Sequence, residues 1–92
     1  MRDSSSITNN EAIAIAQSTG NAIAQGGGVA NVGDSTLDMR NNSSITLNKA
    51  EATVMSGTAT QQGGGVFNSA TLVNVVDGGN VNSNIPDDVF QQ

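Results

Sequence analysis

The phrase QGGGVAN spans residues 25–31, and QGGGVFN returns at residues 62–68. A glycine triplet can form a phosphate-binding loop, or it can mark a tight corner in a repeated unit. A P-loop places Lys and then Ser or Thr directly after its glycines, whereas Val, then Ala or Phe, then Asn follow here. The dinucleotide fingerprint needs a further, spaced glycine, which is also missing. The sequence therefore predicts corners that lead into strands at both triplets, Gly26–Gly28 and Gly63–Gly65.

Both glycine phrases belong to a longer repeat. Residues 5–31 read SSITNNEAIAIAQSTGNAIAQGGGVAN, and residues 43–68 read SSITLNKAEATVMSGTATQQGGGVFN. The SSIT phrases lie 38 residues apart and the GGGV phrases 37, so the match needs a gap of one residue. A second echo follows, with DSTLDMRNN at 34–42 and SATLVNVVD at 69–77, and NVNSN at 80–84 is a weaker third copy of SSIT. A period of 20–50 residues is typical of solenoids and repeat arrays.

Apolar residues alternate with polar ones inside each unit. Leu37 and Met39 flank Asp38, and Ile45 and Leu47 flank Thr46. This period of two, bordered by Gly, Asn and Asp, predicts short strands. The stretch EAIAIAQSTGNAIAQ is rich in Ala, which also suits a helix. Its alternation is strict, however, and its repeat partner EATVMSGTATQQ has a β-like Thr-Val-Met, so we interpret both stretches as strands.

The composition limits the classes of protein to consider. Ninety-two residues allow one domain, and only 12% of them are charged and 2% aromatic. Such a chain suits either disorder or a repetitive β architecture whose backbone ladders supply much of the order. A net charge of −5 without a basic patch argues against nucleic acid as a partner. The absence of Cys and His excludes disulfides and removes the commonest metal ligands.

Targeting segments are not evident either. No apolar run approaches the roughly 18 residues of a membrane helix, so no membrane span is predicted in this chain. The first ten residues, MRDSSSITNN, lack the apolar stretch of a signal peptide.

Stacked coils account for this composition. Neighbouring coils in such a stack pair through backbone hydrogen bonds about 4.8 Å apart, and their corners need residues that tolerate positive φ, namely Gly, Asn and Asp. Asparagines at equivalent corners can also hydrogen-bond along the stack. Asn31 and Asn68, each closing a GGGV phrase, are the predicted pair. The sequence is long enough for about two to four such coils. A solenoid needs at least about three repeats and capped ends, so we expect a fragment of a longer surface protein or a short open reading frame derived from one.

No residue combination in the sequence predicts catalysis, a cofactor or a metal. Asp77, Asp87 and Asp88 do not follow the spacing of an EF-hand or of calcium-binding nonapeptides, and we interpret them as solvated turn acids. Ser and Thr are abundant, but the sequence has no His to activate them and no GxSxG motif. Thr residues are scattered rather than repeated as T-x-T, which argues against an ice-binding face. The prediction is therefore no catalytic, cofactor-binding or metal-binding residues.

The repeat phrases resemble those of polymorphic outer-membrane-protein-like and autotransporter-type right-handed parallel β-helices. Those repeats run as a glycine triplet, an aliphatic residue, often an aromatic, and Asn; a TL strand and then a Ser/Thr-Ile strand closing on Asn follow. The matching positions are Gly63–Asn68, Thr71 with Leu72, and Ser44–Thr46 with Asn48. Two departures stand out. Ala30 occupies the place of the aromatic Phe67, and the longer unit makes residues 11–25 and 49–62 an extra strand or an outward loop.

The resemblance implies an all-β fold, a short right-handed parallel β-helix. It also implies a non-enzymatic structural or adhesive module of a cell-surface or secreted protein. The location would be extracellular or at the outer-membrane surface, and the partners would be cell-surface glycans or host proteins. Exposed edge strands further predict end-to-end self-association.

The predicted organisation is an N-terminal tail at residues 1–4, repeat units at 5–42 and 43–84, and a C-terminal tail at 85–92, where the last coil leaves the stack. Two alternatives stay open. One is a remnant of a β-helical polysaccharide-active enzyme, for which Asp38 and Arg40, two apart on one strand and facing the same side, are the only local hint. The other is a disordered Asn/Ser/Gly-rich segment.

Overall fold

The computed structural model describes all residues, 1–92, as an all-β protein with ten strands and no helix. Its strands form four sheets, ordered β1-β5-β9, β3-β7-β10, β2-β6 and β4-β8, and every pairing is parallel. The prediction of an all-β, parallel architecture is confirmed. The strands are β1 (Ser6–Thr8), β2 (Glu11–Gln25), β3 (Val29–Asn31), β4 (Thr36–Asp38), β5 (Ser44–Thr46), β6 (Lys49–Gln62), β7 (Val66–Asn68), β8 (Thr71–Val73), β9 (Val81–Asn82) and β10 (Val89–Gln91).

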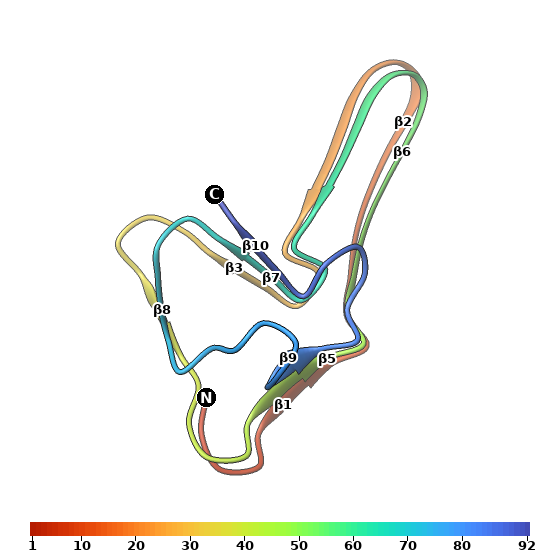
Figure 1. Cartoon of the computed structure of the whole chain (residues 1–92). Coiled ribbons are helices and arrows are strands. Elements are labelled where there is room, and N and C mark those ends of the chain that lie inside the picture. The colour runs from red at the N-terminus through yellow and green to blue at the C-terminus, as the bar shows by residue number, and fades with distance from the viewer.

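Successive passes of the chain lie on one another in the register of the sequence repeat (Figure 1). The two SSIT phrases pair as β1 on β5, with Ile7 opposite Ile45, and β9 adds the third copy with Val81 opposite Ile45. Likewise, β3 and β7 pair the two GGGV phrases, and β4 and β8 pair the two TL phrases. We call the segments β1–β4, β5–β8 and residues 75–92 the first, second and third passes.

The longest pairing joins β2 to β6 and contains the one-residue gap of the repeat. Ala16 lies opposite Val54, 38 residues on, whereas Thr19 lies opposite Ser56, 37 residues on. The register shift falls between these two pairs, close to Gly20 and Gly57. The alanine-rich stretch at residues 11–25 is therefore a strand, as its alternation predicted.

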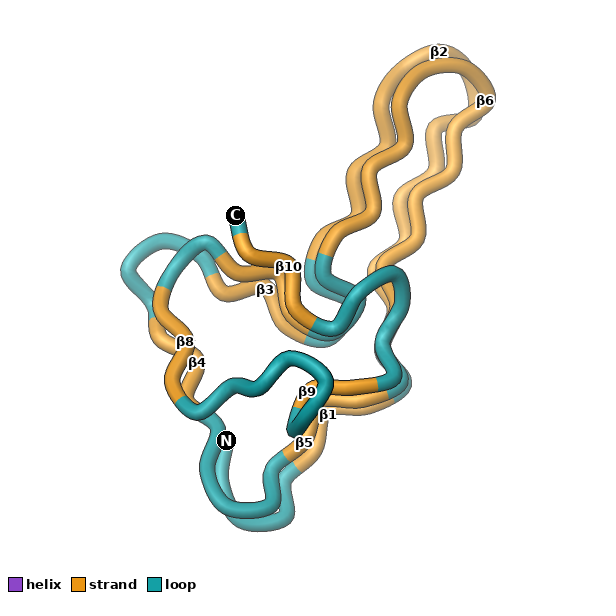
Figure 2. The backbone as a smooth tube through the Cα atoms, viewed as in Figure 1, coloured by secondary structure: helices purple, strands orange, loops and turns teal.

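Residues 11–25 and 49–62 form an arm that leaves the stack and returns to it (Figure 2). Each strand turns back at its middle, so an outgoing limb faces a returning limb. Alanines fill the space between the limbs, with Ala22, Ala24, Ala50 and Ala52 buried and Ala12, Ala14, Ala16 and Val54 packed against them. Small side chains let the limbs approach closely. The arm is both a strand and an outward projection, and it extends a molecule of 45 × 26 × 16 Å.

The main apolar core lies inside the stacked passes. Met39, Ile45, Val66 and Val81 are almost wholly buried. Seven partly buried residues pack against them: Met1, Ile7, Val29, Leu37, Leu72, Val75 and Val89. Burial of apolar surface stabilises the fold by roughly 25 cal/mol for each Å² removed from water. A core of this size leaves much of the order to the backbone ladders between passes.

The glycine triplets form corners, as predicted. Gly26 and Gly63 have φ of 71° and 66°, a left-handed conformation that glycine adopts without steric cost. Gly27 is constrained in a different way. A Cβ at this position would lie 2.4 Å from the carbonyl oxygen of Lys49, so the passes approach too closely for any side chain.

Both segments predicted as tails, residues 1–4 and 85–92, make contacts with the stack. The Met1 ammonium donates to the Asp38 carbonyl at 2.7 Å, and the Arg40 N–H donates to the Met1 carbonyl at 2.7 Å. At the other end, β10 pairs with β7 and places Val89 against the core. Its VFQ sequence is a third copy of VFN, which the repeat pattern did not reveal. Phe90 stacks on Phe67 with ring centroids 5.7 Å apart.

Candidate functional site

A ladder of asparagine amides, exposed at Asn10 and buried at Asn48 and Asn84, joins the three passes at the base of the arm. The N–H and Nδ2 of Asn10 donate to Oδ1 of Asn48 at 2.9 and 3.1 Å. The same two groups of Asn48 donate to Oδ1 of Asn84 at 2.9 and 3.1 Å. Asn48 is 1% exposed and Asn84 8%. The ladder therefore satisfies backbone and side-chain groups that burial would otherwise leave unpaired.

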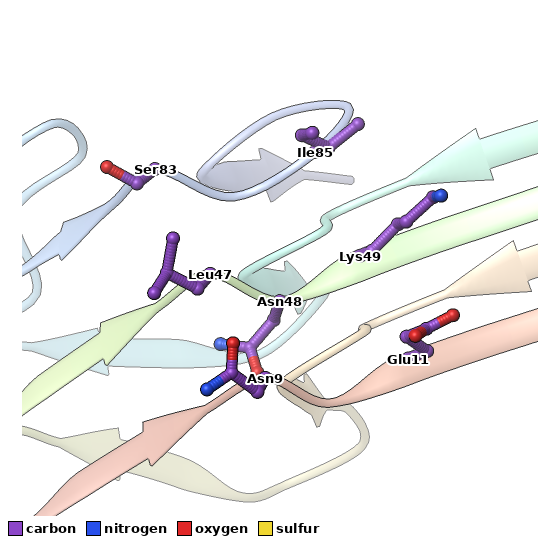
Figure 3. A pocket seen from close by; sticks show the side chains of 7 residues that line it. All are labelled: Asn9, Glu11, Leu47, Asn48, Lys49, Ser83 and Ile85. Atoms are coloured by element: carbon purple, nitrogen blue, oxygen red, sulfur yellow. The ribbon is translucent and has the colours of Figure 1, made fainter.

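Two columns of residues flank this ladder and enclose a shallow hollow of about 270 Å³. Asn9, Leu47 and Ser83 precede the ladder asparagines and form one column. Glu11, Lys49 and Ile85 follow them and form the other, with Glu11 opposite Lys49 and Lys49 bridged to Ile85. Figure 3 shows the Leu47 and Ser83 side chains on one side and those of Lys49 and Glu11 on the other. The hollow combines amide, hydroxyl and charged groups with two exposed aliphatic side chains.

Leu47 is the unusual member of this set. Asn9, Leu47 and Ser83 all have a φ near 60° (60°, 59° and 59°) and so form a left-handed corner in each pass. Asn tolerates this conformation, but in a branched residue without a local hydrogen bond it costs about 1–2 kcal/mol. The side chain is nevertheless 58% exposed. A strained, exposed apolar residue beside a hollow is a candidate for function, because burial does not explain its presence.

The first prediction follows from this strain. Leu47→Asn is expected to raise the free energy of unfolding by about 1 kcal/mol, because Asn accepts the left-handed conformation at little cost. Chemical denaturation followed by circular dichroism measures this change. The matched control is Leu72→Asn, which places the same change at a partly buried core position and is expected to destabilise the fold. A destabilised Leu47→Asn variant would show that the Leu47 side chain supports the fold.

The outer surface of the arm is the second candidate. Side chains that alternate with the buried alanines point away from the arm, and four of them are large, apolar and exposed. Ile13 is 57% exposed, Ile15 63%, Ile23 57% and Met55 78%. Thr53 lies opposite Ile15 and Thr60 opposite Ile23. Ile13 and Ile15 alternate with the inward alanines of the outgoing limb and Ile23 with those of the returning limb, so the two limbs present apolar side chains on opposite outer faces of the arm. Neighbouring exposed apolar side chains such as Ile13 and Ile15 indicate a contact surface.

Asp38 and Arg40 lie close together and form an ion pair with each other. Arg40 lies just beyond β4, and its Nε is 2.9 Å from Oδ2 of Asp38. The other oxygen of Asp38 accepts from Nδ2 of Asn74 at 3.1 Å. The Met39 side chain between them is buried, so the two do face the same, outer side. Both groups thus take part in contacts of the stack itself.

The acids near the C-terminus hold the backbone. Oδ1 of Asp87 accepts from the N–H groups of Gly63 and Gly64 at 2.6 and 3.3 Å. Oδ1 of Asp88 accepts from the N–H and Nδ2 of Asn84 at 2.9 and 3.1 Å. The interpretation of these two as solvated turn acids is wrong, because each carboxylate caps a row of donors. No group of three or more acidic residues gathers in the arrangement of a metal site.

The sequence pattern predicted one side-chain pair of the stack but not the larger ladder. Nδ2 of Asn31 donates to Oδ1 of Asn68 at 2.7 Å, and this contact is buried, as predicted. The Asn10–Asn48–Asn84 ladder carried a similar signal, since each of its asparagines follows the left-handed corner of its pass. The residue at that corner changes from Asn to Leu to Ser, which hid the equivalence.

No family model matches the sequence, and no curated protein or solved structure matches it. The structure has no helix that is long and apolar enough to cross a membrane.

Proposed function

We propose that this chain is a non-enzymatic module, a short right-handed parallel β-helix that displays its arm as a contact surface on a cell-surface or secreted protein. The observation that carries the proposal is the in-register stacking of repeated segments, with the arm projecting from the stack. In such an architecture the stack serves as a rigid scaffold, and projections from it are free to vary and to bind.

The arm provides the kind of surface that a protein partner would use. Its exposed apolar side chains sit on paired strands that hold them in place, with Ile13 and Ile15 on the outgoing limb and Ile23 on the returning limb. Apolar anchors on a rigid element bind with little loss of conformational entropy. The hollow at the base of the arm adds Leu47 and Ile85 beside amide and charged groups, which supply directional contacts. This combination favours host proteins, among the partners that the resemblance implies, over glycans.

The second prediction tests this contact surface. The purified chain is immobilised and exposed to a panel of extracellular-matrix proteins and surface glycans. Ile13→Thr/Ile15→Thr is expected to weaken binding to the recognised protein at least about tenfold, because two exposed anchors are lost. Thr already occupies the position opposite Ile15, so the arm should keep its strand pairing.

Val32→Thr is the matched control, because Val32 is 51% exposed but lies outside the arm. It should bind as the unchanged chain does. Binding that the arm variant leaves intact, or an absence of binding to every member of the panel, would contradict the proposed function.

A further inference from the structure

The two ends of the stack differ in their hydrogen bonding. We call the side of the first pass that faces away from the second the lower face, and the side of the second pass that faces the third the upper face. No strand pairs with β1, β2, β3 or β4 on the lower face. The upper face is covered by β9 on β5 and by β10 on β7, while the arm strand β6 meets the third pass only at its base, where Ala50 N–H donates to Ile85 at 2.8 Å.

The amide ladder runs in one direction and ends at Asp88. Each asparagine donates to the one above it, so the lower face presents Oδ1 of Asn10 as an acceptor without a donor from below. At the top, Asn84 donates both of its groups to Asp88, in the pattern that Asn10 and Asn48 use with their own partners. A carboxylate can only accept when ionised, so it cannot pass the ladder on.

Two further contacts close the upper face. Asp87 accepts from the corner glycines Gly63 and Gly64, whereas the equivalent corner in the first pass donates to the second pass, with Gly27 N–H to Gly63 at 3.0 Å. On the arm, the N–H of Ala52 donates to Oε1 of Gln61 at 2.9 Å. Ala24 occupies the equivalent position in the first pass, and its side chain has no amide oxygen to accept a hydrogen bond. The upper face is therefore capped by side chains and the lower face is not.

The surface beneath this cap fits the lower face of another copy of the same chain. Within one molecule, β1–β4 already pair with β5–β8 in register, including thirteen opposed residue pairs between β2 and β6. A second copy stacked on an uncovered second pass would repeat the layering. Asn48 would donate to the second copy's Asn10, as it now does to Asn84, and Gln62 to its Gln25, as Gln25 now does to Gln62 at 2.8 Å.

We propose that residues 75–92 act as a releasable cap that keeps a second copy of this chain from stacking head-to-tail on the second pass. The cap is the weaker partner for that face. It pairs two residues through β9 and three through β10, and it leaves most of β6 without a strand above it. A second copy would cover the length of the arm as well. Displacement of the cap therefore converts a monomer into a growing stack, and this conversion is independent of the proposed contact surface.

The third prediction releases the cap in the full-length chain. Asp87→Ala/Asp88→Ala removes the carboxylates that hold it, and analytical ultracentrifugation is run over rising concentration. The variant should form species at integer multiples of the monomer mass. The unchanged chain should still be monomeric at a concentration tenfold higher, which corresponds to a difference of at least about 1.4 kcal/mol in association. A variant that keeps its β-type circular dichroism and stays monomeric would overturn the proposal, as would equal assembly of the unchanged chain.

Asp88→Ala alone serves if the double variant loses its strand signal, because it removes only the ladder terminator. The single variant should assemble in the same way, at a higher concentration than the double variant needs. A single variant that is folded and monomeric would again overturn the proposal.

The control blocks the lower face in the double variant. The Asn10 carbonyl points upward, because it accepts from the Lys49 N–H. The backbone N–H and C=O groups of successive residues point alternately up and down along a strand. The Ile13 N–H, three residues on, therefore points downward, away from β6. Ile13→Pro therefore removes an edge donor but no bond within the chain. It should return the double variant to a monomer. Assembly that persists after this change would exclude the lower face as the docking surface.

Discussion

Gly27→Ala is expected to destabilise the fold by about 3 kcal/mol, at the upper end of the range for overpacking. Its Cβ would lie 2.4 Å from the Lys49 carbonyl oxygen and 2.5 Å from that of Gly64. Both contacts are backbone atoms of paired segments, so neither can rotate away. The passes would have to separate at this corner, and the hydrogen bond from Gly27 to Gly63 would lengthen or break.

Chemical denaturation of the variant and of a matched control measures this effect. Gly33→Ala is the control, because Gly33 has φ of 72° and a Cβ at this position would meet no neighbouring atom within 4 Å. It should cost only the left-handed penalty of about 1 kcal/mol. Equal losses for the two variants would show that the passes leave room for a methyl group at position 27, which contradicts the close approach of the backbone there.

Asn48→Leu is the second large effect and is expected to cost about 2 kcal/mol or more. The two side chains have the same branched arrangement of four heavy atoms, but Leu has no polar group, so the amide ladder loses its middle member. The N–H and Nδ2 of Asn10 lose their acceptor, and the Ile7 carbonyl loses the donor that reaches it at 3.1 Å. A buried polar group left unpaired costs about 1–3 kcal/mol. Asn10 is exposed, so its groups contribute less than the partly buried Ile7 carbonyl.

Asn21→Leu makes the same chemical change at an exposed position of β2 and should alter stability by no more than about 0.5 kcal/mol. Denaturation midpoints of the two variants are compared under identical conditions. A loss at Asn48 as small as that at Asn21 would show that the ladder follows from the stacking without stabilising it.

The repeat phrases predicted most of the architecture because parallel stacking places equivalent residues opposite one another. The SSIT, GGGV and TL phrases pair with their copies, and the gap of one residue appears as the register shift after Ala16. The alternation of Ala and Ile predicted a strand where Ala content alone suggests a helix. The pair of Asn31 and Asn68 followed from the same logic, since each asparagine closes an equivalent corner.

In the third pass the pattern predicted only the weak SSIT copy that forms β9, because the rest of its sequence is no longer a close copy. Asp88 occupies a place in the ladder that Asn holds below it, and Asp87 caps a corner that backbone carbonyls cap below. Their roles depend on atoms that the fold brings together rather than on sequence spacing. Leu47 is a similar case, because its left-handed conformation is imposed by a corner that Asn9 and Ser83 fit better.

The central claim is that the chain stacks on itself in the register of its repeat, and one disulfide tests it most directly. The chain contains no cysteine, and the side-chain amides of Gln25 and Gln62 lie 2.8 Å apart. Neighbouring strands are about 4.8 Å apart, within the Cα separation of a disulfide. The double variant Q25C/Q62C should therefore form an intramolecular disulfide under mild oxidation in dilute solution.

The out-of-register pair Q25C/T58C should stay reduced under the same conditions, because Thr58 lies opposite Asn21, about 13 Å along the strand from the position opposite Gln25. We expect a single cross-linked monomer for Q25C/Q62C, detected by mass spectrometry, and none for Q25C/T58C. Equal cross-linking of both pairs, or of neither, would contradict the stacked register.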